Sequence, residues 1–243
     1  LLKGVKRSKV CFANFATISD YLKQEGLKQE VIITPHFIDR SVYRIGAPTS
    51  DVSDRLHEEK KRGSFILTYT GWVSENRGLQ LMMDVIKGLA AKDGRFKLCI
   101  VGCQDDYKEK ISIYAKDNGI EDNVLLYGRS NYDKMPAILM SSDVCLSFLE
   151  VNPVYSVSPP QKVVEYFAAG KPVVANHIQT HEYLIEHGKN GYLLDDAASI
   201  IVHIEKLAND KQLYDELSKN ALEESEKYDK EKIMDVYIKK IEE

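Results

Sequence analysis

The sequence has few cysteines and no long apolar run. Its four cysteines (Cys11, Cys99, Cys103 and Cys145) are scattered and offer neither the paired spacing of zinc ligands nor a disulfide framework. We expect them to be free, buried thiols in a reducing compartment. No apolar stretch approaches the roughly 18 residues that a membrane-spanning helix needs. The sequence therefore predicts no zinc ribbon, no disulfide scaffold and no helix across a bilayer.

An excess of positive charge is also missing. The 33 lysines and arginines are outnumbered by 37 aspartates and glutamates, which gives a formal net charge of -4. Proteins that bind nucleic acid normally carry a large basic excess, so we expect no nucleic-acid partner. The balance still allows a local basic pocket for a small phosphate ligand. The first residues, Leu1 to Arg7, contain neither a methionine nor the apolar stretch of a signal peptide, and we expect the chain to be part of a longer protein.

Strand and helix patterns alternate through the middle of the chain. The predicted strands are 65–70, 96–101, 124–127, 144–149 and 172–175, and the predicted helices are 79–90, 105–118, 133–140 and 159–169. Such alternation predicts βαβ units and hence a doubly wound, Rossmann-like α/β fold with a parallel sheet. Gly71, Gly102 and Gly128 directly follow three of the strands. Because ligands in this fold bind beyond the carboxyl ends of the strands, we expect the site in the loops that these glycines begin.

The two ends of the chain do not continue this alternation. Residues 1–40 contain isolated strands at 10–13 and 31–34 around a helical turn at 19–24. The segment that follows is polar and highly charged, and it predicts a linker with a solvated helix. After further helices, the last residues form a charged helix with a narrow apolar stripe.

The most informative segment runs from Ser158 to Val174. Ser158 is suited to cap a helix N-terminus, Pro159 to stand at its first position, and Gln161 to complete a capping box. An anion at this helix start would meet the amides of Ser158 and Gln161 and the Lys162 ammonium. We therefore expect a helix that begins directly after Ser158 and that offers an anion site.

Glu165 stands in a strongly apolar part of that helix and needs a partner, because an unpaired buried carboxylate would cost several kcal/mol. Lys162, three residues earlier on the same face, is one candidate. A pair of ligand hydroxyls is the other, and the residues alone leave both open. Likewise, Arg77 at the end of the loop 70–78 is either a diphosphate clamp or a solvated loop arginine.

Together these segments resemble the donor-binding half of GT-B glycosyltransferases, specifically glycosyltransferase family 4. That family has a glycine-started loop that ends in a basic residue and glycine, here Gly71 and Arg77-Gly78. It also has a helix with a key glutamate before an Ala-x-Gly-Lys-Pro-Val-Val motif, here Glu165 and residues 168–174. Weaker matches extend the likeness over residues 64–225, about two thirds of the chain.

The resemblance implies a role for each matched residue. Glu165 would bind the ribose hydroxyls of a nucleotide-sugar, and Arg77 with Lys162 would hold and stabilise the departing diphosphate. The remaining donor-binding positions would be Gly71, Gly78, Gly128, Arg129, Ser130 and Ser158, with Gly128, Arg129 and Ser130 beside the base and Ser158 near the phosphates or sugar. The family is retaining and generally needs neither a metal nor a cofactor besides the nucleotide-sugar. The sequence likewise offers no clustered set of His and Asp ligands.

Two positions depart from the family pattern. The usual arginine after the loop glycine is Trp72, so one phosphate contact is missing or comes from elsewhere. The acidic residue usually found eight positions before the glutamate is Val157, and Tyr155, Ser156 and Ser158 are the nearest polar substitutes for it.

The resemblance also predicts the domain organisation. Residues 1–40 would be the remnant of an N-terminal acceptor domain with the interdomain crossover, 41–63 a linker, 64–225 the donor-binding domain, and 226–243 a helix that packs back on the N-terminal domain. A saccharide or lipid-linked acceptor would bind the missing domain, so this fragment alone is expected to be inactive. We expect a cytoplasmic protein, with peripheral contact to the inner membrane face if the acceptor is a lipid.

The predicted function is a retaining glycosyltransferase of surface-polysaccharide or glycolipid biosynthesis. Two alternatives stay open. A nucleotide-sugar epimerase shares the architecture but needs acid and base residues in the cleft between domains. A module that binds a nucleotide-sugar or a partner protein without turnover would fit the departures at Trp72 and Val157.

Overall fold

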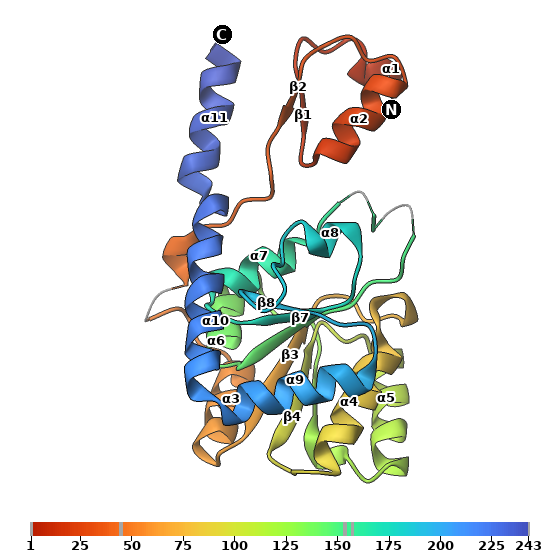
Figure 1. Cartoon of the computed structure of the whole chain (residues 1–243), viewed down its shortest axis with the longest axis vertical. Coiled ribbons are helices and arrows are strands. Elements are labelled where there is room, and N and C mark those ends of the chain that lie inside the picture. Colours follow the sequence, from red (N-terminus) through yellow and green to blue (C-terminus); the bar gives the residue numbers. More distant parts are fainter. Residues whose placement is uncertain (1, 44–45, 153–154, 157, 243) are drawn as a thin grey trace.

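A six-stranded parallel sheet lies at the centre of the larger part of the molecule, within the residues that the structure describes (Figure 1). The structure is a computed structural model, and it describes residues 2–43, 46–152, 155–156 and 158–242. The strands are β3 (Phe65–Thr70), β4 (Phe96–Val101), β5 (Val124–Tyr127), β6 (Val144–Ser147), β7 (Val173–Ala175) and β8 (Gly191–Leu193). The predicted α/β fold with a parallel sheet is confirmed.

The order of the strands across the sheet is β5-β4-β3-β6-β7-β8. The chain therefore builds the sheet outward from β3 in one direction and then crosses over to continue from β6 in the other. Where the direction reverses, the loops after β3 and β6 diverge and leave a crevice at the carboxyl edge. This edge is where the sequence placed the ligand site.

Alternate residues of the strands enter two hydrophobic cores, because side chains of a strand point to opposite faces of the sheet. Leu67 and Tyr69 of β3 lie in one core with helices α4 (Leu79–Ala90), α5 (Asp105–Asp117) and α9 (Ala197–Asn209). Ile66 lies in the other, with α3 (Asp51–Lys61), α6 (Met135–Met140) and α7 (Gln161–Ala168). Burial on both faces explains the nearly continuous apolar sequence of these strands.

The solvated helix predicted within the polar stretch 46–63 is wrong in one respect. Helix α3 forms there, but one of its faces is buried, with Leu56 fully enclosed beside α6 and β3. Glu59 is also buried, and Arg55 holds its carboxylate at 2.7 Å. Most residues of α3 are charged, and its apolar stripe consists of only a few residues. Such a short stripe is not recognisable in the sequence.

A smaller unit precedes the sheet. It consists of α1 (Leu2–Val5), the parallel pair β1 (Cys11–Ala13) and β2 (Val31–Ile33), and α2 (Ala16–Gln24) between the two strands. The chain then passes through a short 3-10 helix, η1 (Arg40–Val42), to the linker and α3. The assignment of this unit to a larger N-terminal domain stays a prediction.

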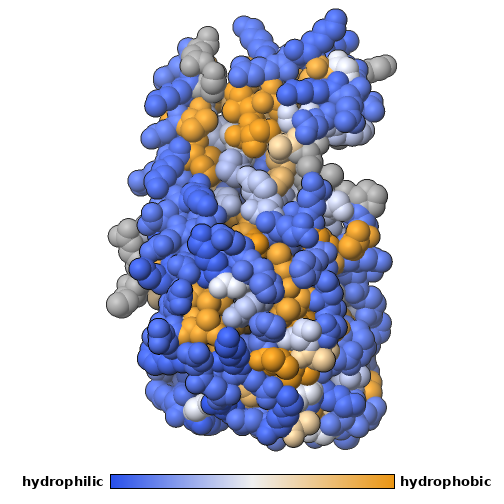
Figure 2. All heavy atoms as spheres, viewed as in Figure 1, coloured by the Kyte–Doolittle hydropathy of each residue, from blue (hydrophilic) through white to orange (hydrophobic). Residues whose placement is uncertain are grey.

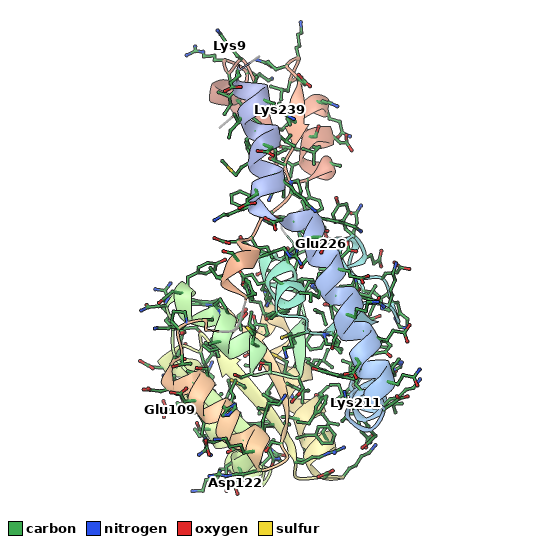
Figure 3. All side chains as sticks on the ribbon, turned by 90° about the vertical axis from the view of Figure 1, so that its left-hand side faces the viewer. Lys9, Glu109, Asp122, Lys211, Glu226 and Lys239 are labelled. Carbon is green, nitrogen blue, oxygen red and sulfur yellow. The ribbon has the colours of Figure 1, made fainter. Side chains whose placement is uncertain are left out.

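The end of the chain returns to this smaller unit. Helices α10 (Lys211–Glu224) and α11 (Lys230–Glu242), joined by η5 (Ser225–Tyr228), run along the molecule to the end where β1 and β2 lie (Figure 1). The rings of Phe12 in β1 and Tyr237 in α11 are 4.7 Å apart, and Lys230 forms an ion pair with Asp39. Apolar side chains gather on the surface between α11 and these strands (Figure 2). Lys9 and Lys239 accordingly lie at the same end in a perpendicular view (Figure 3). No helix among the described residues has the length and apolar character to cross a membrane.

Candidate functional site

A cavity of about 690 Å³ opens at the carboxyl edge of the sheet. Its lining comes from the loops after β3, β4 and β5, the segment before α7 and the first turns of α7 itself. Seven of the predicted site residues border it: Gly71, Arg77, Arg129, Ser130, Ser158, Lys162 and Glu165. The volume falls in the usual range for small-molecule sites, which is roughly 300–1,000 Å³.

The two remaining predicted residues, Gly78 and Gly128, are not among those that line the cavity in the described part of the chain. Gly78 has a φ of 69°, and a Cβ on it would meet the Cβ of Phe148 at 2.3 Å. It therefore lets α4 start tightly against the loop after β6. The carbonyl oxygen of Gly128 accepts a hydrogen bond of 3.0 Å from the Gly102 amide, which joins the ends of β5 and β4. Both glycines shape the loops of the site, and their contact with a donor stays a prediction.

Arg77 projects from a short 3-10 helix, η2 (Glu75–Arg77), between two tyrosines. Its guanidinium carbon lies 5.6 Å from the centroid of the Tyr155 ring. Burial alone would lower the pKa of Arg77, but the contacts with Tyr69 and Tyr155 raise it above its ordinary value. Arg77 is thus a fixed cation at the cavity wall and not a freely solvated loop residue.

Lys162 is a second cation beside Arg77. Its Nζ is buried and makes no hydrogen bond or ion pair with any described residue, and it lies 3.9 Å from the centroid of the Tyr69 ring. The pKa of Lys162 is lowered to about 7, mainly by burial and in addition by repulsion from Arg77, while attraction by Glu165 raises it in part. The proposed ion pair between Lys162 and Glu165 is therefore not formed, although the two charges attract each other at a distance.

Glu165 lies one turn further along α7 and also faces the cavity. Burial raises its pKa, while the Lys162 charge and the Tyr132 hydroxyl lower it in part. The buried Tyr43 hydroxyl lies near the same carboxylate and interacts with the Tyr132 hydroxyl, and burial and the Glu165 charge raise the pKa of Tyr43. The carboxylate thus stays available to accept hydrogen bonds from a ligand. Sequence reasoning missed both tyrosines: Tyr132 begins the short 3-10 helix η4 (Tyr132–Lys134), Tyr43 directly follows η1, and neither position belongs to a recognised motif.

The predicted capping of α7 by Ser158 is wrong. The helix begins at Gln161 with Pro160 as its N-cap, and no side chain caps it. Two successive prolines have no amide hydrogens and hold the backbone extended, so the chain enters the helix two residues later than the capping pattern implied. Val157, which departs from the family pattern, lies outside the described residues.

Ser158 instead contacts the smaller unit that precedes the sheet. Its hydroxyl oxygen accepts a hydrogen bond of 3.3 Å from the Asn14 amide, and the His36 ring donates from Nε2 to the Pro159 carbonyl oxygen at 3.1 Å. Burial lowers the pKa of His36, so the ring is neutral near neutral pH. Asn14 and His36 are more than a hundred residues from Ser158 in the sequence, and only the folded chain brings them together.

Tyr166 joins the wall that carries Lys162 to the end of β3. Its fully buried hydroxyl accepts from the Thr70 amide at 3.0 Å and lies 2.9 Å from the Thr70 hydroxyl. The Arg77 loop begins one residue later. Tyr166 thus joins the helix that carries Lys162 to the start of the loop that carries Arg77.

Residues 53–224 match the sequence profile of the family described as Glycosyl transferases group 1, well over half of the chain. The chain belongs to this family. An uncharacterized glycosyltransferase of Haemophilus influenzae is 30% identical over 168 residues, 68% of this group 1 chain and 45% of the relative. The chain thus spans about half the length of that curated relative.

Solved structures resemble the group 1 chain in fold. Anabaena HepE, crystallised in complex with UDP-glucose, matches with a TM-score of 0.81 and 19% identity over 99% of this chain and 66% of that one. The C-terminal domain of a group 1 family protein, LpcC from Francisella tularensis, matches with a TM-score of 0.64 and 16% identity over 79% of this chain and 99% of that one. The family predicted from the Arg77 and Glu165 motifs and its fold are confirmed.

Proposed function

We propose that the chain is the donor-binding part of a retaining glycosyltransferase that moves a sugar from a nucleoside-diphosphate sugar to an acceptor. One observation carries the proposal: the buried Lys162 ammonium has no anionic or hydrogen-bonding partner in the described chain, and it lies beside Arg77 at the wall of a cavity. Two neighbouring cations repel each other. A diphosphate would supply the counter-charge that both groups lack.

The reaction needs stabilisation of negative charge on the departing diphosphate. Arg77 and Lys162 are fixed by Tyr69, Tyr155 and α7, so they are in place before the charge develops. One preorganised donor of this kind is typically worth about 3–4 kcal/mol in the transition state. Two side-chain cations would perform the charge neutralisation for which other transferases bind a metal ion.

Glu165 supports a nucleotide in the same cavity. Its carboxylate would accept hydrogen bonds from two ribose hydroxyls, and the Tyr132 hydroxyl would orient it. The base would then lie by Arg129 and Ser130, which border the cavity after β5. The UDP-glucose bound to the structurally similar HepE is consistent with this ligand class.

Retention would proceed by attack of the acceptor from the side of the leaving group. A covalent route needs a nucleophile with a base at the reacting carbon. Ser147 and His181 form such a hydrogen bond of 2.9 Å, but both side chains are completely buried away from the cavity. That pair serves the core, where it links β6 to α8 (Gln179–Glu182).

The acceptor would bind an N-terminal domain of which residues 1–40 are a part. The family match begins at residue 53, and the chain covers nearly all of the C-terminal domain of LpcC. A saccharide or lipid-linked acceptor of surface-polysaccharide or glycolipid biosynthesis, reached from the cytoplasmic side of the membrane, would suit this arrangement.

The experiment compares two lysines that both lie over a tyrosine ring. Lys162→Met removes the cavity cation, and Lys110→Met removes the matched surface lysine, whose Nζ is 4.9 Å from the Tyr107 ring centroid. Titration calorimetry with UDP, GDP and ADP should find one that binds the wild type and Lys110→Met alike and Lys162→Met at least about tenfold more weakly. If none binds the wild type, the proposed function is wrong.

Catalysis is tested separately with the full-length protein. It should release nucleoside diphosphate from one of a panel of nucleotide-sugars when acceptor is present, whereas this 243-residue chain alone should transfer no sugar. Tight binding without release by the full-length protein would favour the non-catalytic module. Robust transfer by the chain alone would overturn the domain assignment.

A further inference from the structure

Trp72 borders the cavity on the same loop as Arg77 and is the single tryptophan of the chain. Its residue is 57% exposed, whereas Thr70 and Val73 on either side are buried. Trp72 is the single aromatic residue of the loop 71–78, and its exposed side chain borders the cavity.

The backbone that presents this ring is fixed. Gly71 has a φ of 120°, a conformation that side-chain-bearing residues rarely adopt, and it turns the chain sharply after β3. The Tyr69 hydroxyl then donates a hydrogen bond of 2.8 Å to the Trp72 carbonyl oxygen. Tyr69 is itself buried, and Lys162 lies over its ring. The backbone of Trp72 is therefore held by a residue of the core.

Cations already cover two of the tyrosine rings at this end of the cavity. Lys162 lies over Tyr69, and Arg77 lies over Tyr155. Trp72 has no stacked ring and no cation of this kind among the residues that the structure describes. Its ring face therefore remains free for a ligand.

The strand order places Trp72 along the cavity. Arg129 and Ser130 follow β5, Gly102 follows β4, and Trp72 follows β3, so these loops succeed one another along the sheet edge. With the base at the β5 end, the diphosphate lies at the β3 end with Arg77, and Trp72 borders the cavity on the same loop. The sugar is bonded to that diphosphate, so it lies within reach of this loop. A sugar ring presents C–H groups of partial positive charge, which suit the electron-rich face of an indole.

We propose that Trp72 is a stacking platform for a pyranose ring at the diphosphate end of the cavity. The ring belongs either to the donor sugar or to the acceptor saccharide, which share this chemistry. The inference rests on the proposed function, because the position of the sugar follows from that of the diphosphate. It gives a different role to a position where the resembling family has a phosphate-binding arginine.

The single tryptophan makes the test direct, because all tryptophan emission of the chain comes from Trp72. The probes are whichever of UDP, GDP or ADP binds, its glucose or mannose ester, and the matching methyl pyranoside added to the diphosphate complex. We expect a blue shift with the ester or with the added pyranoside, and little change with the diphosphate alone. A shift with the ester assigns the donor sugar, and a shift with the pyranoside assigns the acceptor.

Affinities of variants complete the test. Trp72→Ala should weaken binding of the sugar-bearing probe about fivefold to tenfold and leave the diphosphate within about twofold of wild type. Trp72→Phe should recover most of the loss, and Tyr21→Ala, at another exposed aromatic residue, should change neither affinity. Equal loss for the diphosphate and its ester, or no emission change with either sugar, would overturn the platform. Failure of every diphosphate to bind would instead overturn the proposed function on which it rests.

Discussion

The ammonium of Lys162 lies 3.9 Å from the centroid of the Tyr69 ring, with no hydrogen-bond acceptor at its Nζ among the described residues. A tyrosine ring offers part of the compensation that a buried cation needs, on the order of 2 kcal/mol when desolvated. A counter-ion would offer more, since buried charges are otherwise paired. Lys162 thus lacks the counter-ion that a diphosphate would supply, and several measurable properties follow from that.

The first prediction is that diphosphate binding takes up a proton at Lys162. Burial and the Arg77 charge together hold the pKa of Lys162 at about 7, and a diphosphate beside it would raise that pKa. Between about pH 7 and the raised pKa, binding therefore adds a proton, and affinity falls as the pH increases. Calorimetry in buffers of different ionisation heat should detect the uptake near pH 8, where the terminal phosphate is already ionised because its pKa is about 6. Lys162→Met should abolish it.

The second prediction concerns stability of the empty chain. The folded pKa of Lys162 is lower than its unfolded value of about 10.4, so the unfolded state binds more protons between about pH 7 and 10. The contribution of Lys162 to the free energy of unfolding of the wild type should therefore rise with pH across that window. Lys162→Met should flatten this rise and raise the melting temperature at neutral pH, because an apolar side chain replaces an unpaired buried charge. A lower melting temperature with unchanged ligand affinity would make Lys162 structural.

The third prediction is that Glu165 recognises ribose. Glu165→Gln should weaken nucleoside diphosphate binding by about 2–4 kcal/mol, from two weakened charge-assisted hydrogen bonds. A ligand without ribose hydroxyls should bind wild type and variant alike. Glu109→Gln, at the surface on α5, is the control (Figure 3). Loss of thermal stability while affinity persists would assign the carboxylate to the fold.

The sequence predicted five of the six strands for a physical reason and missed β8, which lies in a region expected to be helical. Strands buried on both faces, such as β3 and β4, are nearly continuous apolar runs closed by glycine, and such a signal is local. Arg77, Lys162 and Glu165 stand beside those signals in recognisable motifs. The start of α7 was predicted two residues too early. Ser158 and Gln161 have the residue types of a capping box, but Pro159 and Pro160 keep the backbone extended up to Gln161.

Contacts between distant segments could not be predicted in this way. The Asn14–Ser158 and His36–Pro159 hydrogen bonds join the smaller unit to the start of α7, and no periodicity links residues so far apart. The position of Lys162 over Tyr69 likewise depends on how α7 packs on β3, which Tyr166 and Thr70 determine together.

The fourth prediction is that burial of neutral His36 makes stability depend on pH. Burial lowers the pKa of His36, while the hydrogen bond to the Pro159 carbonyl oxygen raises it in part, because the protonated ring also donates from Nε2. Since the folded pKa is lowered overall, the stability linked to His36 is present above about pH 6.5 and is lost as the pH falls through the folded value. His36→Phe has no titrating ring and no donor to Pro159, so it should lower the melting temperature at neutral pH and reduce its further fall on acidification below about pH 6.5. An equal pH dependence of the melting temperature in wild type and variant would contradict this role.

The last prediction concerns Arg77. Because Trp72 occupies the position of the arginine that is usual in the family, Arg77 is the main cation of the loop after β3. Arg77→Ala should weaken nucleoside diphosphate binding by about 2–3 kcal/mol, as loss of a charge-assisted contact in a partly dry cavity would. Arg77→Lys should recover part of this, because a point charge remains while the bidentate fork is lost. A nucleoside without phosphates should bind wild type and both variants alike.

The structure adds a second readout for the same variant and a matched control. Because the Arg77 charge lowers the pKa of Lys162, Arg77→Ala should move the midpoint of proton uptake to higher pH. Arg95→Ala removes another ring-stacked arginine, 5.3 Å from the Phe96 centroid, and should change neither affinity nor midpoint. Affinities at two salt concentrations complete the measurement, since phosphate contacts by charge weaken as salt increases. If Arg77→Ala binds the diphosphate as tightly as wild type and leaves the midpoint in place, the phosphate site lies elsewhere in the cavity and Arg77 serves only to hold Tyr155.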